Sequence, residues 1–214
     1  MFSMFYSRKD HSAMLAKNKR STMILYVNNH DPLCHRIKIA LAEKDIVVDI
    51  INVEKKGNPE ELYELNPYGK VPILMTKDLI VYEPDIIFEY LEERFPHPPL
   101  LSVFPLERAY ARILCKEIDD TWIPILISAL TTKDKNKKQN YKKELLKILF
   151  SLVPVVHRQP YLLGERFSIV DCSLAAILYR LPHLDIRLPK QAMPLIKYAA
   201  RLFKSAAFRK SIKI

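Results

Sequence analysis

Val71-Pro72-Ile73-Leu74-Met75 is the stretch of this 214-residue sequence that decides the fold. Its apolar residues are typical of a buried strand, and a proline is tolerated at the first position because no ladder hydrogen bond is needed there. A second apolar run at 79–82 follows after a turn at Lys77-Asp78, so the two runs pair naturally as antiparallel strands. The sequence therefore predicts two paired strands, the first of which opens on an X-Pro bond.

The residues around this pair predict a complete small domain. Asp31-Pro32 is a helix cap followed by proline in the first helical turn, and Pro59 and Pro84 open two further helices in the same way. The expected elements are a strand over 23–28, a helix over 32–44, a strand over 46–53, a helix over 59–65, the strands over 71–75 and 79–82, and a helix over 84–94. This βαβαββα order, with a strand beginning at Val71-Pro72, is typical of a thioredoxin-like domain, in which the X-Pro bond is usually cis.

The second half of the chain has a different pattern. Residues 95–105 hold four prolines, at 96, 98, 99 and 105, and predict an extended linker. Amphipathic stretches at 106–130, 140–156, 168–180 and 191–204 then predict an all-helical domain over 106–214. The sequence thus predicts an α/β domain over 21–94 and an all-α domain, preceded by a basic extension over 1–20 that we expect to be disordered. Met14 is the expected initiator, ahead of Met1 and Met23.

Composition excludes several function classes. Three glycines are too few for a phosphate-cradling loop or a dinucleotide-binding fingerprint, and three widely spaced cysteines fit reduced thiols. The histidines and cysteines form no recognisable ligand set, so we expect no metal. No run of about 18 apolar residues predicts a membrane span, and the expected location is the cytoplasm. The net charge is +10, of which residues 1–22 contribute +4, with five basic residues and one acidic residue, and the rest +6.

The order of elements, the proline-bearing linker and the box Ser168-x-x-Asp171 together resemble the glutathione transferase superfamily. That box predicts the capped start of a buried helix and carries a structural role only. Longer motifs resemble one branch, the stringent starvation protein A family, and the similarity covers about residue 18 to the C-terminus. These motifs are Ile39-Ala-Leu-Ala-Glu-Lys44, Leu65-Asn-Pro67 with Val71-Pro72, Glu89-Tyr-Leu-Glu-Glu-Arg-Phe-Pro-His-Pro-Pro-Leu100, and Phe167-Ser-Ile-Val-Asp-Cys172.

The resemblance implies where a glutathione site would lie and how this chain departs from it. Asp31 stands where transferases carry a Ser, Tyr or Cys, and a carboxylate there would repel a thiolate. Pro84 follows Glu83 where those enzymes have a serine, so both a hydroxyl and a backbone N–H are missing. Glu83, Val71 and Pro72 remain as possible contacts of a degraded site. We therefore expect no catalysis and no cofactor.

The resemblance also implies a binding function centred on Phe95, Pro96, His97, Pro98 and Pro99. Prolines fix an exposed backbone, so these side chains could meet a protein partner at little ordering cost. The family's role in transcription control predicts RNA polymerase holoenzyme, both core and sigma factor, as the partner during starvation or acid stress. A homodimer is expected, and basic residues could touch promoter DNA.

Two alternatives stay open at the level of sequence. The first is a glutathione-dependent transferase or reductase that uses Cys34 at a helix N-terminus or an unrecognised hydroxyl, although a buried helical cysteine is favoured for Cys34. The second is a non-specific nucleic-acid binder that uses the basic tract 133–147, although a solvated helix face is favoured. The roles of Tyr110 and Trp122 on the first helix of the second domain also stay open.

Overall fold

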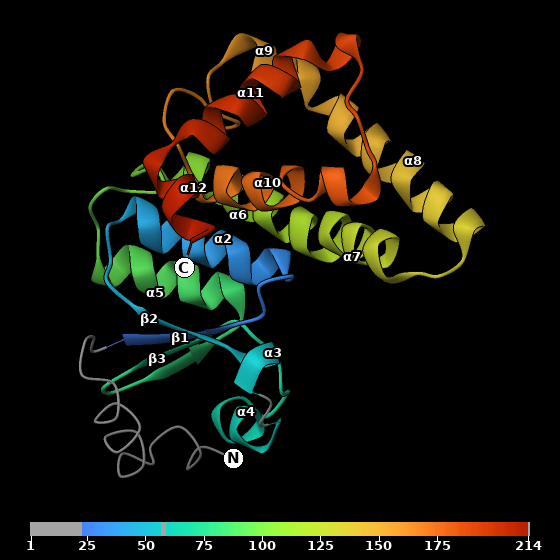
Figure 1. The fold of residues 1–214 in the computed structure, drawn as a ribbon. Helices are drawn as coiled ribbons and strands as arrows, with labels where there is room; N and C mark the ends of the chain where they lie inside the picture. The colour runs from blue at the N-terminus through green and yellow to red at the C-terminus, as the bar shows by residue number, and fades with distance from the viewer. Residues whose placement is uncertain (1–22, 57–58, 214) are drawn as a thin grey trace.

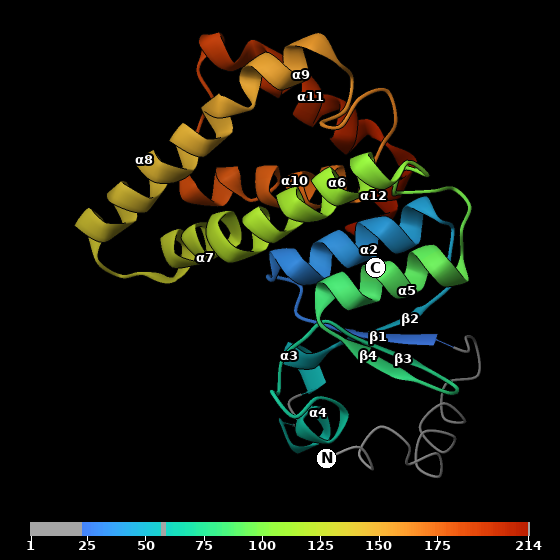
Figure 2. The ribbon, with the colours of Figure 1, turned by 180° about the vertical axis from the view of Figure 1, so that it is seen from behind.

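A computed structural model describes residues 23–56 and 59–213 of the chain (Figure 1). The basic extension over 1–20 and the choice between Met1 and Met14 as initiator lie outside the described residues. A four-stranded sheet forms one part of the molecule, and helices from the second half of the chain are stacked on the other side of α2 (Pro32–Glu43) and α5 (Pro84–Arg94), as the reverse view also shows (Figure 2).

The sheet has the strand order β2-β1-β3-β4. β1 (Met23–Val27) runs parallel to β2 (Asp49–Asn52) and antiparallel to β3 (Ile73–Thr76), which pairs antiparallel with β4 (Ile80–Tyr82). Alternate residues of β1 face opposite sides, as the two-residue repeat of a strand requires. Leu25 and Val27 join the main core with α2 (Pro32–Glu43) and α5 (Pro84–Arg94), whereas Ile24 and Tyr26 face a smaller cluster.

The smaller cluster is closed by the helices between β2 and β3. These are α3 (Val53–Lys56) and α4 (Pro59–Leu65), of which α4 supplies Leu62 and Leu65. The predicted order of strands and helices is confirmed, with α3 as a short addition that the sequence pattern did not predict. The Val71-Pro72 bond is cis, in accord with the thioredoxin-like pattern.

From Pro105 on, the described residues form helices joined by loops and no strand, apart from an isolated bridge between Tyr161 and Gly164. They are α6 (Pro105–Glu117), the π-helical turn η2 (Ile118–Trp122), α7 (Ile123–Thr131), α8 (Lys135–Ser151), α9 (Val153–Arg158), α10 (Ile169–Leu178), the 3-10 turns η3 (Leu181–Leu184) and η4 (Lys190–Ala192), α11 (Met193–Lys204) and α12 (Ala206–Ser211). The fold class of a thioredoxin-like part plus a helical part is thereby confirmed. Helix α2 joins the two parts, since it packs against both α10 and α12.

Three local predictions were wrong in detail. The second strand begins at Asp49 rather than at residue 46, because the backbone N–H of Ile46 closes the end of α2 by donating to Leu41 O at 2.9 Å. Helical spacing predicts that Ile86 shares a buried apolar stripe with Ile87, Tyr90 and Leu91, but Ile86 is 57% exposed and Phe88 is buried instead. The helix predicted from residue 140 begins earlier, where Asp134 caps α8 by accepting the N–H groups of Asn136 and Lys137.

No helix among the described residues is both long enough and apolar enough to cross a bilayer. The boundaries of the two domains and of the linker stay predictions, although residues 95–104 lie between α5 and α6 and form neither helix nor strand.

Candidate functional site

The proline-histidine loop, residues 95–101, leaves α5 and leads toward α6. The side chains of Pro96, His97, Pro98 and Pro99 are exposed, and the His97-Pro98 bond is cis. Phe95 is half-buried against the main core, with the Arg94 guanidinium 5.3 Å from its ring centroid. The loop therefore presents four exposed residues while its first residue is held by packing.

A buried lysine donates hydrogen bonds to the backbone of this loop. Lys44, at the C-terminal end of α2, donates from Nζ to the Phe95 carbonyl at 2.7 Å and to the Pro98 carbonyl at 2.9 Å. The same Nζ lies 2.6 Å from Glu92 Oε1, and the Lys44 and Glu92 side chains are 0% and 6% exposed. An ammonium group has three N–H donors, so Lys44 has an acceptor for each of them.

Glu92 holds the other end of the loop. Its carboxylate accepts the backbone N–H of Leu100 at 3.1 Å and that of Leu101 at 3.1 Å. A buried ion pair costs desolvation energy unless further hydrogen bonds satisfy both ions, and here each ion has such bonds. We call Lys44 and Glu92 the brace, because together they contact the loop backbone at four residues.

Sequence reasoning named the loop but missed the brace. Helical spacing could have found Glu92, since it lies four residues after the buried Phe88 and next to the buried Leu91. Nothing in the sequence distinguishes Lys44 from the chain's many exposed lysines, because its role depends on where α2 ends relative to α5.

A cavity of about 640 Å³ lies beside the loop. Residues 99–104 line one side of it and residues 163–168 line the other. The Ile169 N–H donates to the Leu100 carbonyl at 3.0 Å, which ties the end of the loop to the start of α10. The proline-histidine loop thus borders a hollow surface as well as solvent.

Ser168 and Asp171 form the capping box at the start of α10. Asp171 Oδ2 accepts the Ser168 N–H at 2.8 Å and the Ser168 hydroxyl at 2.7 Å. Its other oxygen accepts the Leu162 N–H at 3.0 Å and the Tyr198 hydroxyl at 2.6 Å. Burial raises the pKa of Asp171, which the hydrogen bond from Tyr198 opposes. The box therefore also fixes the preceding turn and α11 onto α10.

The sheet brings the predicted glutathione-site positions to one edge. Tyr26, Ile73 and Tyr82 are opposite one another in the register, so the segments that follow β1, precede β3 and follow β4 meet there. Asp31, Val71-Pro72 and Glu83-Pro84 belong to these segments. Glu83 has a φ of 68°, an uncommon backbone conformation for a non-glycine residue, and Pro84 is the first residue of α5.

Neither Asp31 nor Cys34 has the properties of a nucleophile. Asp31 caps α2 by accepting the Leu33 N–H at 2.7 Å. Cys34 is 1% exposed and accepts the Asn28 N–H at 3.4 Å. Burial, with the charge of Asp31 as the next cause, raises the pKa of the Cys34 thiol well above its usual value. The thiol is therefore protonated and shielded from solvent.

The other two cysteines are buried as well, and burial raises the pKa of Cys115 to about 12. Among the described residues, no three His, Cys, Asp or Glu side chains lie close enough to hold a metal ion.

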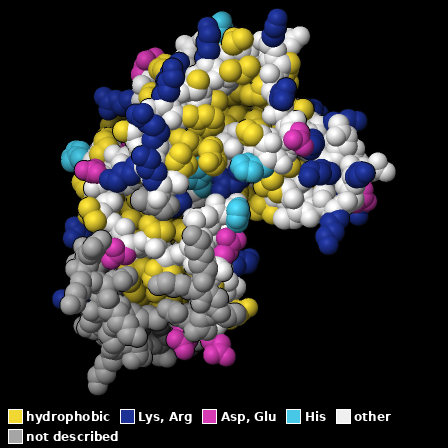
Figure 3. Space-filling view, viewed as in Figure 1, with side chains coloured by type: hydrophobic (Ala, Val, Ile, Leu, Met, Phe, Trp, Pro, Cys, Tyr) yellow, Lys and Arg dark blue, Asp and Glu magenta, His cyan; other side chains and the backbone are white. Residues whose placement is uncertain are grey.

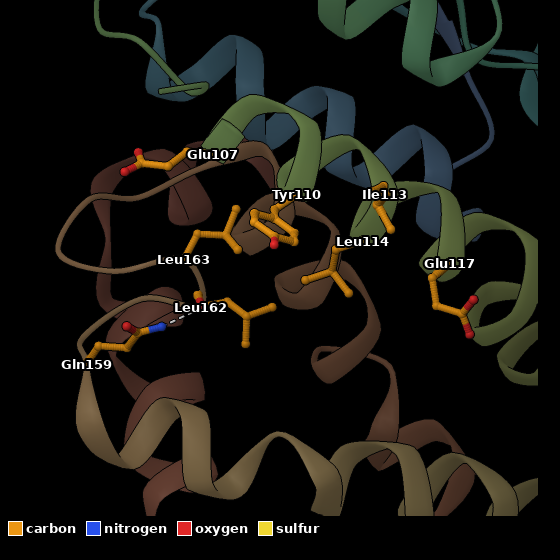
Figure 4. A pocket seen from close by; sticks show the side chains of 8 residues that line it. All are labelled: Glu107, Tyr110, Ile113, Leu114, Glu117, Gln159, Leu162 and Leu163. Carbon is orange, nitrogen blue, oxygen red and sulfur yellow. Dashed lines mark hydrogen bonds between the residues drawn. The ribbon is translucent and has the colours of Figure 1, made fainter. Parts of the chain in front are cut away.

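The two aromatic residues whose roles stayed open lie in different surroundings. Trp122 is 7% exposed and belongs to the main core, whereas Tyr110 is 59% exposed. Tyr110 and Leu114 project from α6 toward Leu162 and Leu163 across a cavity of about 510 Å³ (Figure 4). Gln159 Nε2 donates to the Leu162 carbonyl at 2.6 Å and fixes that wall. Tyr110 therefore belongs to a surface and Trp122 does not.

Comparison with known proteins defines the class. Family models described as the glutathione S-transferase N-terminal and C-terminal domains match residues 27–99 and 111–205. The crystal structure of glutathione transferase Omega 3C from Trametes versicolor has a TM-score of 0.79 and 25% identity, and the match covers 94% of each chain. The chain is therefore a protein of the glutathione transferase-like class.

Closer relatives define the family. The stringent starvation protein A homolog of Haemophilus influenzae is 40% identical over 92% of this chain and 93% of that protein. The corresponding homolog of Coxiella burnetii is 39% identical over 91% of this chain and 93% of that protein. The chain belongs to the stringent starvation protein A family.

Proposed function

We propose that this chain regulates transcription by binding RNA polymerase holoenzyme in the cytoplasm during starvation or acid stress, and that the proline-histidine loop is its contact. The observation that supports this most directly is the brace, in which Lys44 and Glu92 are buried and their polar groups are directed at the loop backbone. Family membership supports the choice of partner.

The brace suits a binding loop because it removes an ordering cost. An exposed loop that becomes fixed only on binding loses conformational entropy at that moment, which weakens affinity. Here the carbonyls of Phe95 and Pro98 are already held, so Pro96 and His97 are presented in one arrangement. The function is then surface complementarity and involves no bond making.

The absence of catalysis is part of the same proposal. Cys34 is buried and protonated, Asp31 is engaged in capping α2, and Pro84 has no N–H to offer a ligand. Retention on immobilised glutathione together with conjugation of an aromatic electrophile would contradict this part of the proposal.

We further propose a homodimer that forms through the exposed apolar face of α6. Five large apolar side chains just before this helix and along it are exposed: Val103 (78%), Phe104 (62%), Leu106 (67%), Tyr110 (59%) and Ile113 (65%). Large exposed apolar patches mark interaction sites in folded proteins. Sedimentation at micromolar concentration should give twice the chain mass, and a monomer under those conditions would remove this proposal.

Basic residues would add contacts to DNA near the bound polymerase. Lys135, Lys137 and Lys143 on α8 are exposed, and dark-blue side chains gather over the arm formed by α7 and α8 (Figure 3). Such charges favour association with anionic surfaces in a manner that salt weakens. Tight, steeply salt-dependent DNA binding by the free chain would favour the nucleic-acid alternative instead.

The decisive experiment captures polymerase holoenzyme with the wild-type chain and with a Pro96→Ala/His97→Ala variant. The chain offers a matched control in Pro182→Ala/His183→Ala, since this second Pro-His pair is also exposed and lies far from the loop in sequence. We expect the loop variant to lose about tenfold or more in affinity, the scale of an interface hot spot, while the control binds as wild type does.

Circular dichroism establishes that both variants are folded. Equal capture by the loop variant would place the contact elsewhere, and failure of the wild-type chain to bind holoenzyme would refute the proposed function.

A further inference from the structure

Three charged side chains meet where α2, α5 and the π-helical turn η2 come together. The side chain of Arg36, from α2, is 0% exposed, while those of Asp119, from η2, and Asp85, from the first turn of α5, are 16% and 49% exposed. Both carboxylates contact the same nitrogen, since Arg36 Nη2 donates to Asp85 Oδ1 at 3.1 Å and to Asp119 Oδ2 at 2.7 Å. Arg36 Nη1 donates to the other Asp119 oxygen. We call these three residues the charged triad.

The charged triad holds one positive and two negative charges when both carboxylates are ionised, and the groups around it do not supply a second positive charge. Arg36 Nη1 also donates to the Ser173 hydroxyl of α10 at 3.4 Å, which is a neutral group. Burial raises the pKa of the nearby Cys115 thiol to about 12, so the thiol is neutral too. Lys116, in the preceding turn, contacts the exposed Asp120 at 2.9 Å instead. The triad therefore carries a net charge of about −1 when neither aspartate holds a proton.

The two carboxyl groups act on each other as well as on the arginine. Burial raises the pKa of Asp119 to about 6, and the charge of Asp85 and a hydrogen bond between the two carboxyl groups act in the same direction, whereas Arg36 opposes them. A hydrogen bond between two carboxyl groups requires a proton on one of them, because an ionised carboxylate only accepts. The arrangement therefore favours one shared proton, which brings the net charge of the triad to zero.

The backbone and the arginine at this place are unusual in their own right. Asp119 lies in η2, a π-helical turn between two α-helices, and such turns often occur at functional positions. Arg36 Nε is buried and has no hydrogen-bond partner among the described residues, so the guanidinium is held through its two Nη atoms. Its central carbon lies 5.2 Å from the centroid of the Phe88 ring. The hold on Arg36 therefore depends on the charge state of the two aspartates.

We propose that the charged triad is a proton-binding site, which takes up one proton shared by Asp119 and Asp85 as the pH falls below neutral and thereby strengthens the contact between η2 and α5. Above this range the two carboxylates repel each other beside Arg36. When one carboxyl group takes a proton from solvent, its O–H donates to the other carboxylate, so a hydrogen bond replaces the repulsion. The site is independent of the polymerase contact.

The test follows the carboxyl carbons of the aspartates in the whole chain by carbon-13 NMR as the pH is lowered from 8 to 4. In the wild-type chain we expect the Asp119 signal to titrate with a midpoint near pH 6, and the Asp85 signal to respond over the same range. Asp119→Asn resembles the protonated form but cannot titrate, so it should remove this response. Asp120→Asn is the matched control, because it changes the exposed neighbour and should leave the midpoint where it is.

Two further measurements separate a shared proton from burial alone. Asp85→Asn removes the second carboxylate and keeps Asp119 buried, so the Asp119 midpoint should move to lower pH. A carboxyl group with a raised pKa binds its proton more tightly in the folded chain than in the unfolded chain, where the pKa of aspartate is about 3.9. The unfolding free energy of wild type should therefore rise relative to that of Asp119→Asn as the pH falls from 7 to 5.

An Asp119 midpoint near pH 4, the value of an exposed aspartate, would overturn the proposal, and so would an unchanged midpoint in Asp85→Asn. A difference in unfolding free energy between wild type and Asp119→Asn that stays constant from pH 7 to pH 5 would also overturn it. The wild-type titration and Asp85→Asn decide the question even if Asp119→Asn does not fold.

Discussion

The two buried basic residues Lys44 and Arg180 lie near opposite ends of α2 and have different kinds of partner. At the C-terminal end, Lys44 has a carboxylate at 2.6 Å and two carbonyl acceptors, so its charge and all its donors are satisfied within the fold. Nearer its N-terminal end, α2 contacts Arg180, whose guanidinium donates to three backbone carbonyls and to His35 Nδ1, all of them neutral groups. Lys44 thus has a carboxylate within hydrogen-bond distance, whereas among the described residues no carboxylate lies within 4 Å of the Arg180 guanidinium nitrogens.

This difference separates a cation whose charge is paired within the fold from one that neutral groups hold. A buried cation with a matched carboxylate fixes the backbone around it, and removing it leaves a buried anion. A buried cation held by neutral groups, such as Arg180, is compensated less completely within the fold. Arg36, on the same helix, is intermediate: it pairs with Asp119 and Asp85, but its Nε has no partner among the described residues.

The largest expected effect comes from breaking the satisfied end. Lys44→Met should destabilise the chain by about 3 to 5 kcal/mol, because Glu92 is left buried without its counter-ion. Urea unfolding followed by circular dichroism measures this, with the exposed Lys143→Met expected within about 0.5 kcal/mol of wild type. A loss below about 1 kcal/mol for Lys44→Met would mean that the pair is not a brace.

A double variant sharpens the same point. Lys44→Met/Glu92→Gln removes both charges and keeps an amide oxygen for the Leu100 or Leu101 N–H. It should therefore recover part of the stability that Lys44→Met loses. It should not recover polymerase capture, because the Phe95 and Pro98 carbonyls stay unheld.

An intermediate effect is expected at the other end of α2 on lowering the pH. Arg180 Nη1 donates to His35 Nδ1, and His35 Nε2 lies 3.2 Å from Ser211 Oγ, so the fold holds the neutral ring. Its pKa is lowered to about 3, and in the unfolded chain it returns to near 6.5. Below about pH 6.5 the unfolded state binds the extra proton, so stability falls as the pH falls, by up to about 1.4 kcal/mol per pH unit.

His35→Gln isolates this contribution, since glutamine can accept from Arg180 and donate to Ser211 without titrating. The unfolding free energies of both proteins are measured at pH 7, 6 and 5. Only wild type loses the stability that comes from the neutral His35 ring, so its advantage over His35→Gln should shrink or reverse as the pH falls. The difference between the two proteins cancels the opposite contributions of Asp31 and Asp171, whose raised pKa values favour the folded state at lower pH. A constant difference across this range would show that His35 does not titrate in this way.

Sequence alone predicted the fold well because the signals were local. Prolines at the first helical position mark the starts of α2, α4 and α5, and strand runs with a turn at Lys77-Asp78 give β3 and β4. The π-helical turn between α6 and α7 escaped prediction, because it continues the helix with no break in the apolar pattern.

Sequence predicted much less of the two charge arrangements, since both depend on contacts between distant segments. Arg180 reaches His35 across 145 residues, and Lys44 reaches Phe95 across 51. In the sequence, Arg180 and Lys44 are simply two of 34 lysines and arginines. Burial is what distinguishes them, and burial is set by the packing of α2 against α5, α10 and α12.

The smallest expected effect concerns Cys34, which lies one turn before Lys38 and tests whether the N-terminal end of α2 could support thiol chemistry. Its thiol is 1% exposed and protonated. A thiolate-selective reagent at pH 8 should therefore label Cys34 only as fast as the chain unfolds. Cys34→Ala should cost about 1 kcal/mol, the value of a small buried group, and leave polymerase capture unchanged. Labelling within seconds under native conditions would mean that the thiol reaches solvent as an anion. That result would return the glutathione-dependent alternative to consideration, because that alternative requires a reactive Cys34 thiol near the N-terminus of α2.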